Sequence, residues 1–184
     1  GGTFAFTTKD VGDGNKTVNV SAVTVNDGNS GNNYAVTYAA NTTSTITQLD
    51  LSVTGSTAAN RVYDGTTAET LGGTAAVSQI SGDTVTVGGT AVGSFENENV
   101  GTGKAVTVTG VTIGGTDAGN YNLVQQTGLT ANITAASITI STSDVSRVYN
   151  AELNAAGTAV LTSGTLFSDD SLSGGTFAFT TKDA

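Results

Sequence analysis

A ten-residue string occurs twice in this chain and constrains the fold more than any other feature. Residues 1–10 read GGTFAFTTKD, and residues 174–183 read the same. Because Gly88-Gly89-Thr90 stands near the midpoint, the chain repeats with a period of about 87 residues. This period is too long for one coil of a solenoid, whose repeats run to about 20–45 residues. The repeating unit is therefore the size of a small domain.

Each repeat carries the pattern of β-strands. Residues 104–113 alternate apolar side chains with Thr and Gly, as half-buried strands do. Turn pairs such as Asp27-Gly28, Asp64-Gly65 and Gly72-Gly73 recur at roughly 8–12 residues, the spacing typical of sandwiches. We therefore predict an all-β chain of small, immunoglobulin-like β-sandwich repeats of about 87 residues, arranged end to end. Strands are expected at 2–8, 16–25, 34–38, 43–47, 49–53, 60–63, 74–80, 84–87, 90–95, 104–113, 121–125, 129–134, 137–141, 157–162 and 175–181.

The composition removes most catalytic mechanisms. With no Cys and no His, the chain lacks disulfides, thiolate nucleophiles and the commonest general base. Acidic residues are not paired consistently between the copies, so no enzyme is expected. The net charge of −9 repels nucleic acid and anionic membrane surfaces. No apolar run approaches the roughly 20 residues of a spanning helix, so direct membrane insertion is not expected either.

Three ordered strings resemble the motifs of a known family. Residues 61–67, RVYDGTT, resemble the YDG repeat of very large secreted bacterial proteins, often of the filamentous-haemagglutinin type. Residues 99–104, NVGTGK, are similar to its mid-repeat motif, and residues 117–121, DAGNY, to its late motif. The third copy departs from the pattern at Asn150-Ala151, which replace Asp-Gly, and the first copy at Asn32, which replaces Gly.

The resemblance also indicates where repeats begin and end. Residues 133–137 are similar to the family's junction between repeats. This predicts that 1–47 is the C-terminal part of one repeat, 48–134 a complete YDG-type repeat, and 135–184 the N-terminal part of the next. Alternatively, repeats open at Gly-Gly-Thr and span 1–87 and 88–173, with 174–184 as a spare strand. Structural roles are expected for Arg61, Tyr63, Asp64, Gly65, Gly101, Gly103, Lys104, Gly119, Asn120, Tyr121, Arg147 and Tyr149.

Two features have both a binding and a structural interpretation. Phe4 and Phe6 lie on one strand face, as in a sugar-binding platform, but a core role is favoured because aromatic residues are few and Trp is absent. Asp27 and Asn29 resemble the start of a calcium loop, with Asp117 as a further oxygen donor. The closing Glu of such a loop is missing, so turn formation is favoured. No cofactor is expected, and calcium is the weaker alternative.

The resemblance implies a secreted or cell-surface bacterial adhesin or biofilm-matrix protein. We expect a structural extender that spaces an adhesive tip from the cell or builds an extracellular fibre, because duplication supplies length. The alternative is a module that binds a glycan or partner weakly and gains avidity from number. The expected partners are neighbouring repeats of the same protein. Residues 135–184 of one chain and 1–47 of another are also expected to complete each other, giving head-to-tail association into fibres.

Overall fold

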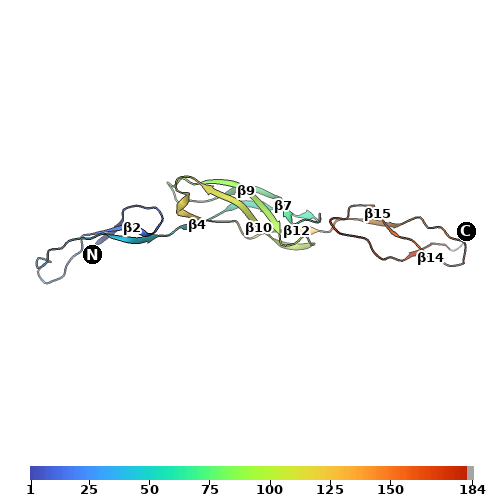
Figure 1. Cartoon of the computed structure of the whole chain (residues 1–184), viewed down its shortest axis with the longest axis horizontal. Coiled ribbons are helices and arrows are strands. Elements are labelled where there is room, and N and C mark those ends of the chain that lie inside the picture. The colour runs from blue at the N-terminus through green and yellow to red at the C-terminus, as the bar shows by residue number, and fades with distance from the viewer. Residues whose placement is uncertain (182–184) are drawn as a thin grey trace. The chain divides into compact units, whose positions relative to one another are not determined.

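The computed structural model describes residues 1–181 (Figure 1). Within these residues it has sixteen β-strands and one short 3-10 helix, which confirms the all-β fold class. The immunoglobulin-like sandwich, the end-to-end arrangement and the division at residues 47 and 134 stay predictions. Lys182 and Asp183, the last two residues of the second GGTFAFTTKD copy, lie outside the described residues.

Most strands form where alternation and turn residues predict them. They are β1 (Thr3–Phe6), β2 (Gly12–Ser21), β3 (Asn41–Ile46), β4 (Leu49–Ser52), β5 (Thr54–Ala58), β6 (Arg61–Val62), β7 (Ala68–Glu69), β8 (Leu71–Ala76), β9 (Thr86–Phe95), β10 (Gly101–Gly114), β11 (Tyr121–Val124), β12 (Leu129–Thr134), β13 (Thr139–Thr142), β14 (Asn154–Ala155), β15 (Ala159–Ser163) and β16 (Phe177–Ala178). Helix η1 (Ala118–Asn120) directly precedes β11. No helix among residues 1–181 has the length and apolar character needed to cross a membrane.

Residues 34–38 and the Gly72-Gly73 pair differ from their predictions. Residues 34–38 form no strand and lie in the connection between β2 and β3, where Tyr34 is 64% exposed. The Gly72-Gly73 pair lies inside β8 instead of in a turn. Gly73 has a φ of +78°, and a Cβ there would collide with the carbonyl oxygen of Gly55 on β5. Here the glycines permit a close approach of paired strands, which has the same sequence signature as a turn.

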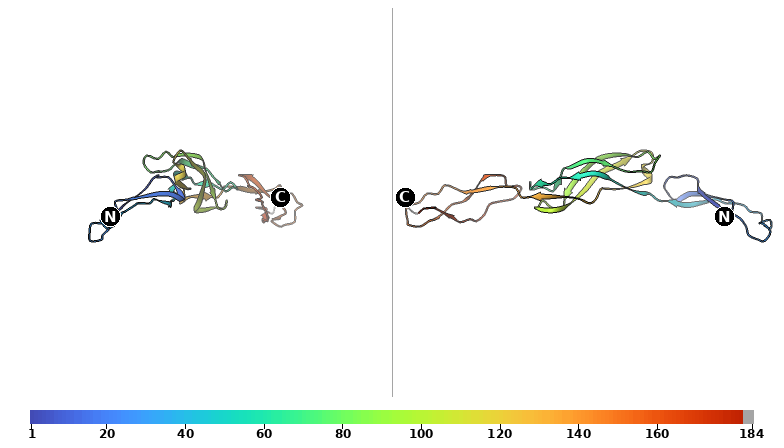
Figure 2. Two further views of the ribbon diagram at one scale, coloured as in Figure 1. Left: turned by 60° about the vertical axis from the view of Figure 1, so that its left-hand side comes forward. Right: turned by 180° about the vertical axis from the view of Figure 1, so that it is seen from behind.

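The chain forms two compact units. The first comprises Gly1–Ser56, Gly73–Val92 and Val108–Gln126, and the second comprises Thr57–Gly72, Gly93–Thr107 and the described residues from Thr127 onward. In the first unit, β2 lies between β1 and β3, and β4 pairs with β11. A five-stranded sheet has the order β6-β12-β10-β9-β7, and β5 pairs with β8, β13 with β15 and β14 with β16. Figure 2 shows the adjacent green and yellow strands β9 and β10 from two further directions.

Equivalent residues oppose each other in two strand pairs. The partners in β2 and β3 are Gly12 with Ile46 and Lys16 with Ser44, and those in β10 and β12 are Gly101 with Ile133 and Lys104 with Ala131. In both pairs the register shifts between the Gly and the Lys, as in a β-bulge. The repeat in the sequence is thus also a repeat of strand pairing.

Burial is concentrated in a small number of side chains. The core cluster of the second unit contains Phe95, Val106, Ala131 and Ile133. Buried side chains of the first unit are Leu51, Val53, Val108, Val111 and Tyr121. The core prediction for Phe4 and Phe6 is wrong, because their residues are 68% and 47% exposed. Both lie on β1, the edge strand of its sheet, where the described residues do not cover the rings.

Candidate functional site

Arg61, at the start of β6, organises the turn that follows it. Its Nη1 lies 2.6 Å from Oδ1 of Asp64 in an ion pair, and its guanidinium also donates to the hydroxyl and carbonyl oxygens of Thr66. Its Nε lies 3.8 Å from Oε2 of Glu69, a buried residue. The planar donor fork of Arg suits this set of acceptors, so Arg61 holds the turn in place and lies beside the buried carboxylate of Glu69.

Asp64 and Gly65 close the turn as their sequence pattern predicts. Asp64 Oδ1 accepts hydrogen bonds from the N–H and the hydroxyl of Thr66, at 2.9 and 2.8 Å. Gly65 has a φ of +73°, which favours glycine. Burial opposes the charged carboxylate, but the hydrogen bonds from Thr66 and Arg61 together lower the pKa of Asp64.

The same turn persists in the third copy despite its changed residues. Asn150 Oδ1 accepts from the N–H of Glu152 at 3.2 Å, as Asp64 does from Thr66. Ala151 takes a φ of +60° where the second copy has Gly65. Arg147 donates to the backbone carbonyl oxygens of Glu152 and Asn154. The replacement of Asp-Gly by Asn-Ala therefore removes the carboxylate of the ion pair but leaves the turn in place.

The arginines also cover aromatic rings. The guanidinium carbon of Arg61 lies 5.2 Å from the ring centroid of Phe95, and that of Arg147 lies 4.9 Å from Phe179. A cation over an aromatic face is attracted by the ring quadrupole. Tyr149, although part of the third copy of the motif, is 62% exposed.

Tyr63 contacts residues far along the chain. Its hydroxyl donates to Oδ2 of Asp170 at 3.1 Å, and its ring meets that of Phe167 edge-on, with centroids 5.7 Å apart. The hydrogen bond to Asp170 is the largest cause that raises the pKa of Tyr63.

The mid-repeat motif forms the bulge of β10. Gly101 lies opposite Ile133, and the N–H of Gly103 donates to Oδ1 of Asn132 at 2.7 Å. Lys104 Nζ donates to Oδ1 of Asn97 at 2.6 Å. These contacts hold the bulge to both of its neighbouring segments.

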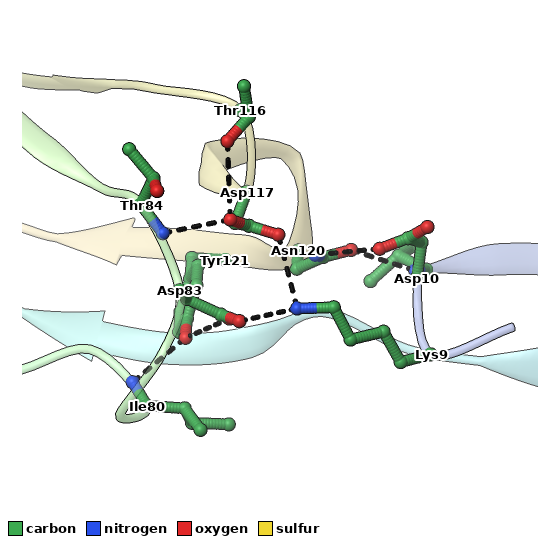
Figure 3. Close-up of polar contacts among 10 residues, drawn as sticks. Lys9, Asp10, Ile80, Asp83, Thr84, Thr116, Asp117, Asn120 and Tyr121 are labelled. Carbon is green, nitrogen blue, oxygen red and sulfur yellow. Dashed lines mark hydrogen bonds and ion pairs between the residues drawn. The ribbon is translucent and has the colours of Figure 1, made fainter.

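A lysine-centred network joins Lys9 to the late motif (Figure 3). Lys9 Nζ lies 2.6 Å from Oδ1 of Asp83 and 3.3 Å from Oδ1 of Asp117. The hydroxyl of Tyr121, the first residue of β11, donates to Oδ2 of Asp83 at 2.7 Å and accepts from the N–H of Ile80 at 2.9 Å. Tyr121 is buried, so it ties the charged pair to the interior of the unit.

Neighbouring contacts complete this network. Asp117 Oδ2 accepts from the N–H of Thr84 at 2.8 Å, and Asn120 Oδ1 accepts from the N–H of Val11 at 2.9 Å. The N–H of Thr84, then Lys9, lower the pKa of Asp117. Hydrogen bonds from Lys9 and then Tyr121 lower the pKa of Asp83. Sequence reasoning did not single out Lys9, whose one signal is its place in the duplicated string.

One segment of the chain matches a known family. A family model described as the YDG domain matches residues 47–128. This segment is a YDG domain. The RVYDGTT, NVGTGK and DAGNY strings all lie inside it. No curated protein and no solved structure matches the chain.

Within the YDG domain, the late motif forms the turn that leads into β11. Gly119 and Asn120 lie in η1, and Tyr121 begins β11. Gln48 Nε2 donates to the carbonyl oxygens of Gly119 and Tyr121, each at 3.1 Å. The Gln48 side chain therefore links the start of the domain to the late motif.

Among the weak calcium candidates, the carboxylates of Asp27 and Asp117 accept hydrogen bonds, and the Asn29 amide donates to Oδ1 of Asn33 at 3.0 Å. Asp27 accepts from the N–H groups of Asn29, Gly31 and Asn33, at 2.8, 2.7 and 3.2 Å. These bonds close a loop outside the YDG domain and lower the pKa of Asp27. Asp117 faces Lys9. Among residues 1–181, no group of three or more Asp, Glu, His or Cys side chains is arranged to hold a metal ion.

Proposed function

We propose that this chain is a structural extender from the stalk of a very large bacterial adhesin, placed at the cell surface or in a secreted biofilm matrix. In this role, the YDG domain transmits force between an adhesive tip and the cell or along an extracellular fibre. The repeated strand register supports the proposal, because an extender gains length by duplication. Its proposed partners are neighbouring repeats and, in a fibre, further copies joined head to tail.

The observation that carries this proposal is how two strands near the start of the YDG domain pair with one strand near its end and with the strand that directly follows it. β4 pairs in parallel with β11, with Leu51 opposite Leu123, and β6 pairs in parallel with β12, with Arg61 opposite Ile133. In a parallel pair, the N-terminal end of one strand and the C-terminal end of its neighbour lie at opposite ends. Force applied to these two ends slides the strands along each other and loads their hydrogen bonds together.

Further hydrogen bonds lengthen both parallel ladders, from a side chain in the first and from the backbone in the second. Beyond β4 and β11, the Gln126 amide donates to the carbonyl oxygen of Ser56 at 2.9 Å and accepts from its N–H at 2.8 Å. Beyond β6 and β12, the N–H of Tyr63 donates to the carbonyl oxygen of Thr134 at 2.8 Å. Each added bond must break in the same step as the ladder, which raises the resistance to shear.

Single-molecule pulling of the whole chain by its two ends tests the proposal. We expect Gln126→Ala to lower the unfolding force of the YDG domain. The matched control is Gln125→Ala, because the Gln125 amide makes the same two kinds of bond to the backbone of Val111, on β10. Equal unfolding forces in the two variants would contradict a shear-bearing role for the parallel pairs.

The alternative is a module that binds glycans or a partner weakly. Exposed aromatic rings favour it, notably Tyr34 and Tyr149, at 64% and 62% exposure. A glycan array and a cell-binding assay on the whole chain separate the two functions. Saturable binding that is lost in Tyr34→Ala or Tyr149→Ala would favour the binding module over the extender.

A further inference from the structure

One turn occurs in two successive copies of the repeat. The N–H of Asp83 donates to the carbonyl oxygen of Ile80 at 3.1 Å, and the N–H of Asp170 donates to that of Phe167 at 3.0 Å. Asp83 and Asp170 are one repeat period apart in the sequence. The two turns are therefore equivalent positions of neighbouring repeats, and we call them the first and second socket turns.

Each socket turn holds its carboxylate against a side chain from the preceding copy. At the first, Asp83 binds Lys9 Nζ at 2.6 Å. At the second, Asp170 accepts from the hydroxyl of Tyr63 at 3.1 Å. Lys9 belongs to the copy before the YDG domain, and Tyr63 belongs to the YDG domain itself.

The opening residues of the two socket turns differ in their surroundings. Ile80 is 57% exposed and lines a cavity of about 190 Å³ together with Val11 and Leu49. At the second turn, the ring of Phe167 packs edge-on against Tyr63. The contact that recurs in both copies is thus the one made by the Asp carboxylate.

We infer that the socket turn is the surface by which each repeat binds the repeat before it, and that one position of the preceding repeat selects the neighbour by charge. That position stands two residues before the Val of the mid-repeat motif. It is Lys9 before Val11 and Glu98 before Val100. The inference rests on the proposed function in one respect, that such repeats follow one another in an array.

The two socket turns differ in the charge of the side chain that faces the Asp carboxylate. Lys9 offers a cation to both Asp83 and Asp117. At the second socket a neutral phenol meets the carboxylate. The hydrogen bond to Asp170 first, and the negative charge of Glu98 to a smaller extent, raise the pKa of Tyr63. Like charges disfavour an interface that opposite charges support. A repeat with Lys at this position is therefore the preferred neighbour of a repeat with the acidic socket.

Amide hydrogen exchange on the whole chain, read separately at the two socket turns, tests the inference. We expect Lys9→Glu to speed exchange at Ile80 and Thr84 about tenfold, the scale of one charged hydrogen bond, and to leave Asp170 unchanged. Glu98→Lys should slow exchange at Asp170. The control is Lys16→Glu, which makes the same charge change on β2, where Lys16 Nζ contacts Thr8.

Amide exchange in the unmodified chain at high salt tests the inference even if a variant misfolds. In the unmodified chain, 1 M NaCl shortens the screening length to about 3 Å and should speed exchange at the first socket turn only. Equal effects of Lys9→Glu and Lys16→Glu, no slowing in Glu98→Lys, or equal salt sensitivity of the two turns would overturn the inference. The extender proposal predicts an effect of Gln126 on the unfolding force, whereas this inference predicts an effect of Lys9 on amide exchange, so the two can fail separately.

Discussion

The guanidinium of Arg61 covers the ring of Phe95 at 5.2 Å from its centroid, and Arg147 covers Phe179 in the same way at 4.9 Å. The two arginines open successive copies of the same motif, and the two phenylalanines follow successive copies of Gly-Gly-Thr, although not at equivalent positions. In both copies, the arginine of the motif thus covers an aromatic ring that follows it in the chain. Because Arg61 also pairs with Asp64 and buried Glu69, one side chain joins the turn to the core.

Arg61→Ala should destabilise the chain by about 3 kcal/mol, because it leaves Glu69 buried without its cation. Arg61→Lys should recover only part of this loss, since Lys keeps the charge without the planar donor fork. Urea denaturation followed by circular dichroism measures both variants. If Arg61→Lys is as stable as the unmodified chain, charge alone suffices and the fork geometry is unimportant.

Phe95→Ala should cost about 3–5 kcal/mol, the usual effect of emptying a buried aromatic site. Phe95 is 3% exposed. The matched control is Phe4→Ala, on a residue that is 68% exposed, and it should change stability by less than about 0.5 kcal/mol. Thermal and urea unfolding of the two variants give the comparison, and similar losses would mean that Phe4 is covered in solution.

Three glycine substitutions separate backbone strain from steric overlap. Gly110 has a φ of +85° and its Cβ would collide with the carbonyl oxygen of Thr90, whereas Gly103 has a φ of +61° in open space. Gly119 has open space without a positive φ. We expect Gly119→Ala to be near neutral, Gly103→Ala to cost about 1–2 kcal/mol, and Gly110→Ala to cost more. Urea midpoints in any other order would contradict the close strand approach at Gly110.

Acid should loosen the network around Lys9. The pKa values of Asp83 and Asp117 are lowered in the folded chain, from an ordinary value of 3.8. Their stabilising effect is therefore complete above about pH 5 and is lost as the pH falls through the folded-state values. Tyrosine fluorescence and amide exchange at Thr84, followed from pH 7 to pH 2, should report this loss.

Lys9→Ala is the control for the acid experiment. Without Lys9, the pKa of Asp83 loses the largest cause of its lowering, so the acid transition at Thr84 should move to higher pH. The raised pKa of Lys9 itself means that its contribution persists at neutral pH and is lost only in strong alkali. A transition at the same pH in both proteins would show that Lys9 does not hold these carboxylates.

The sequence alone determined the repeat period, the all-β class, the turn at Asp64-Gly65 and the start of β11 at Tyr121. Each depends on local chemistry: alternation of side chains, an Asp that bonds its own backbone, and a Gly with positive φ. These preferences act within a few residues, so they can be recognised without knowing what lies nearby.

Only the tertiary structure decided which copy of a motif is buried and what it meets. Asn33-Tyr34 and Asn120-Tyr121 are equivalent strings, yet Tyr34 is 64% exposed and Tyr121 only 4%. The Gly-Gly pair of β8 is a close strand contact, and Lys9 gains its carboxylates from residues more than 70 positions away. Burial, pairing and charge depend on segments that folding brings together. The sequence of one motif does not specify which of these segments will pack against it.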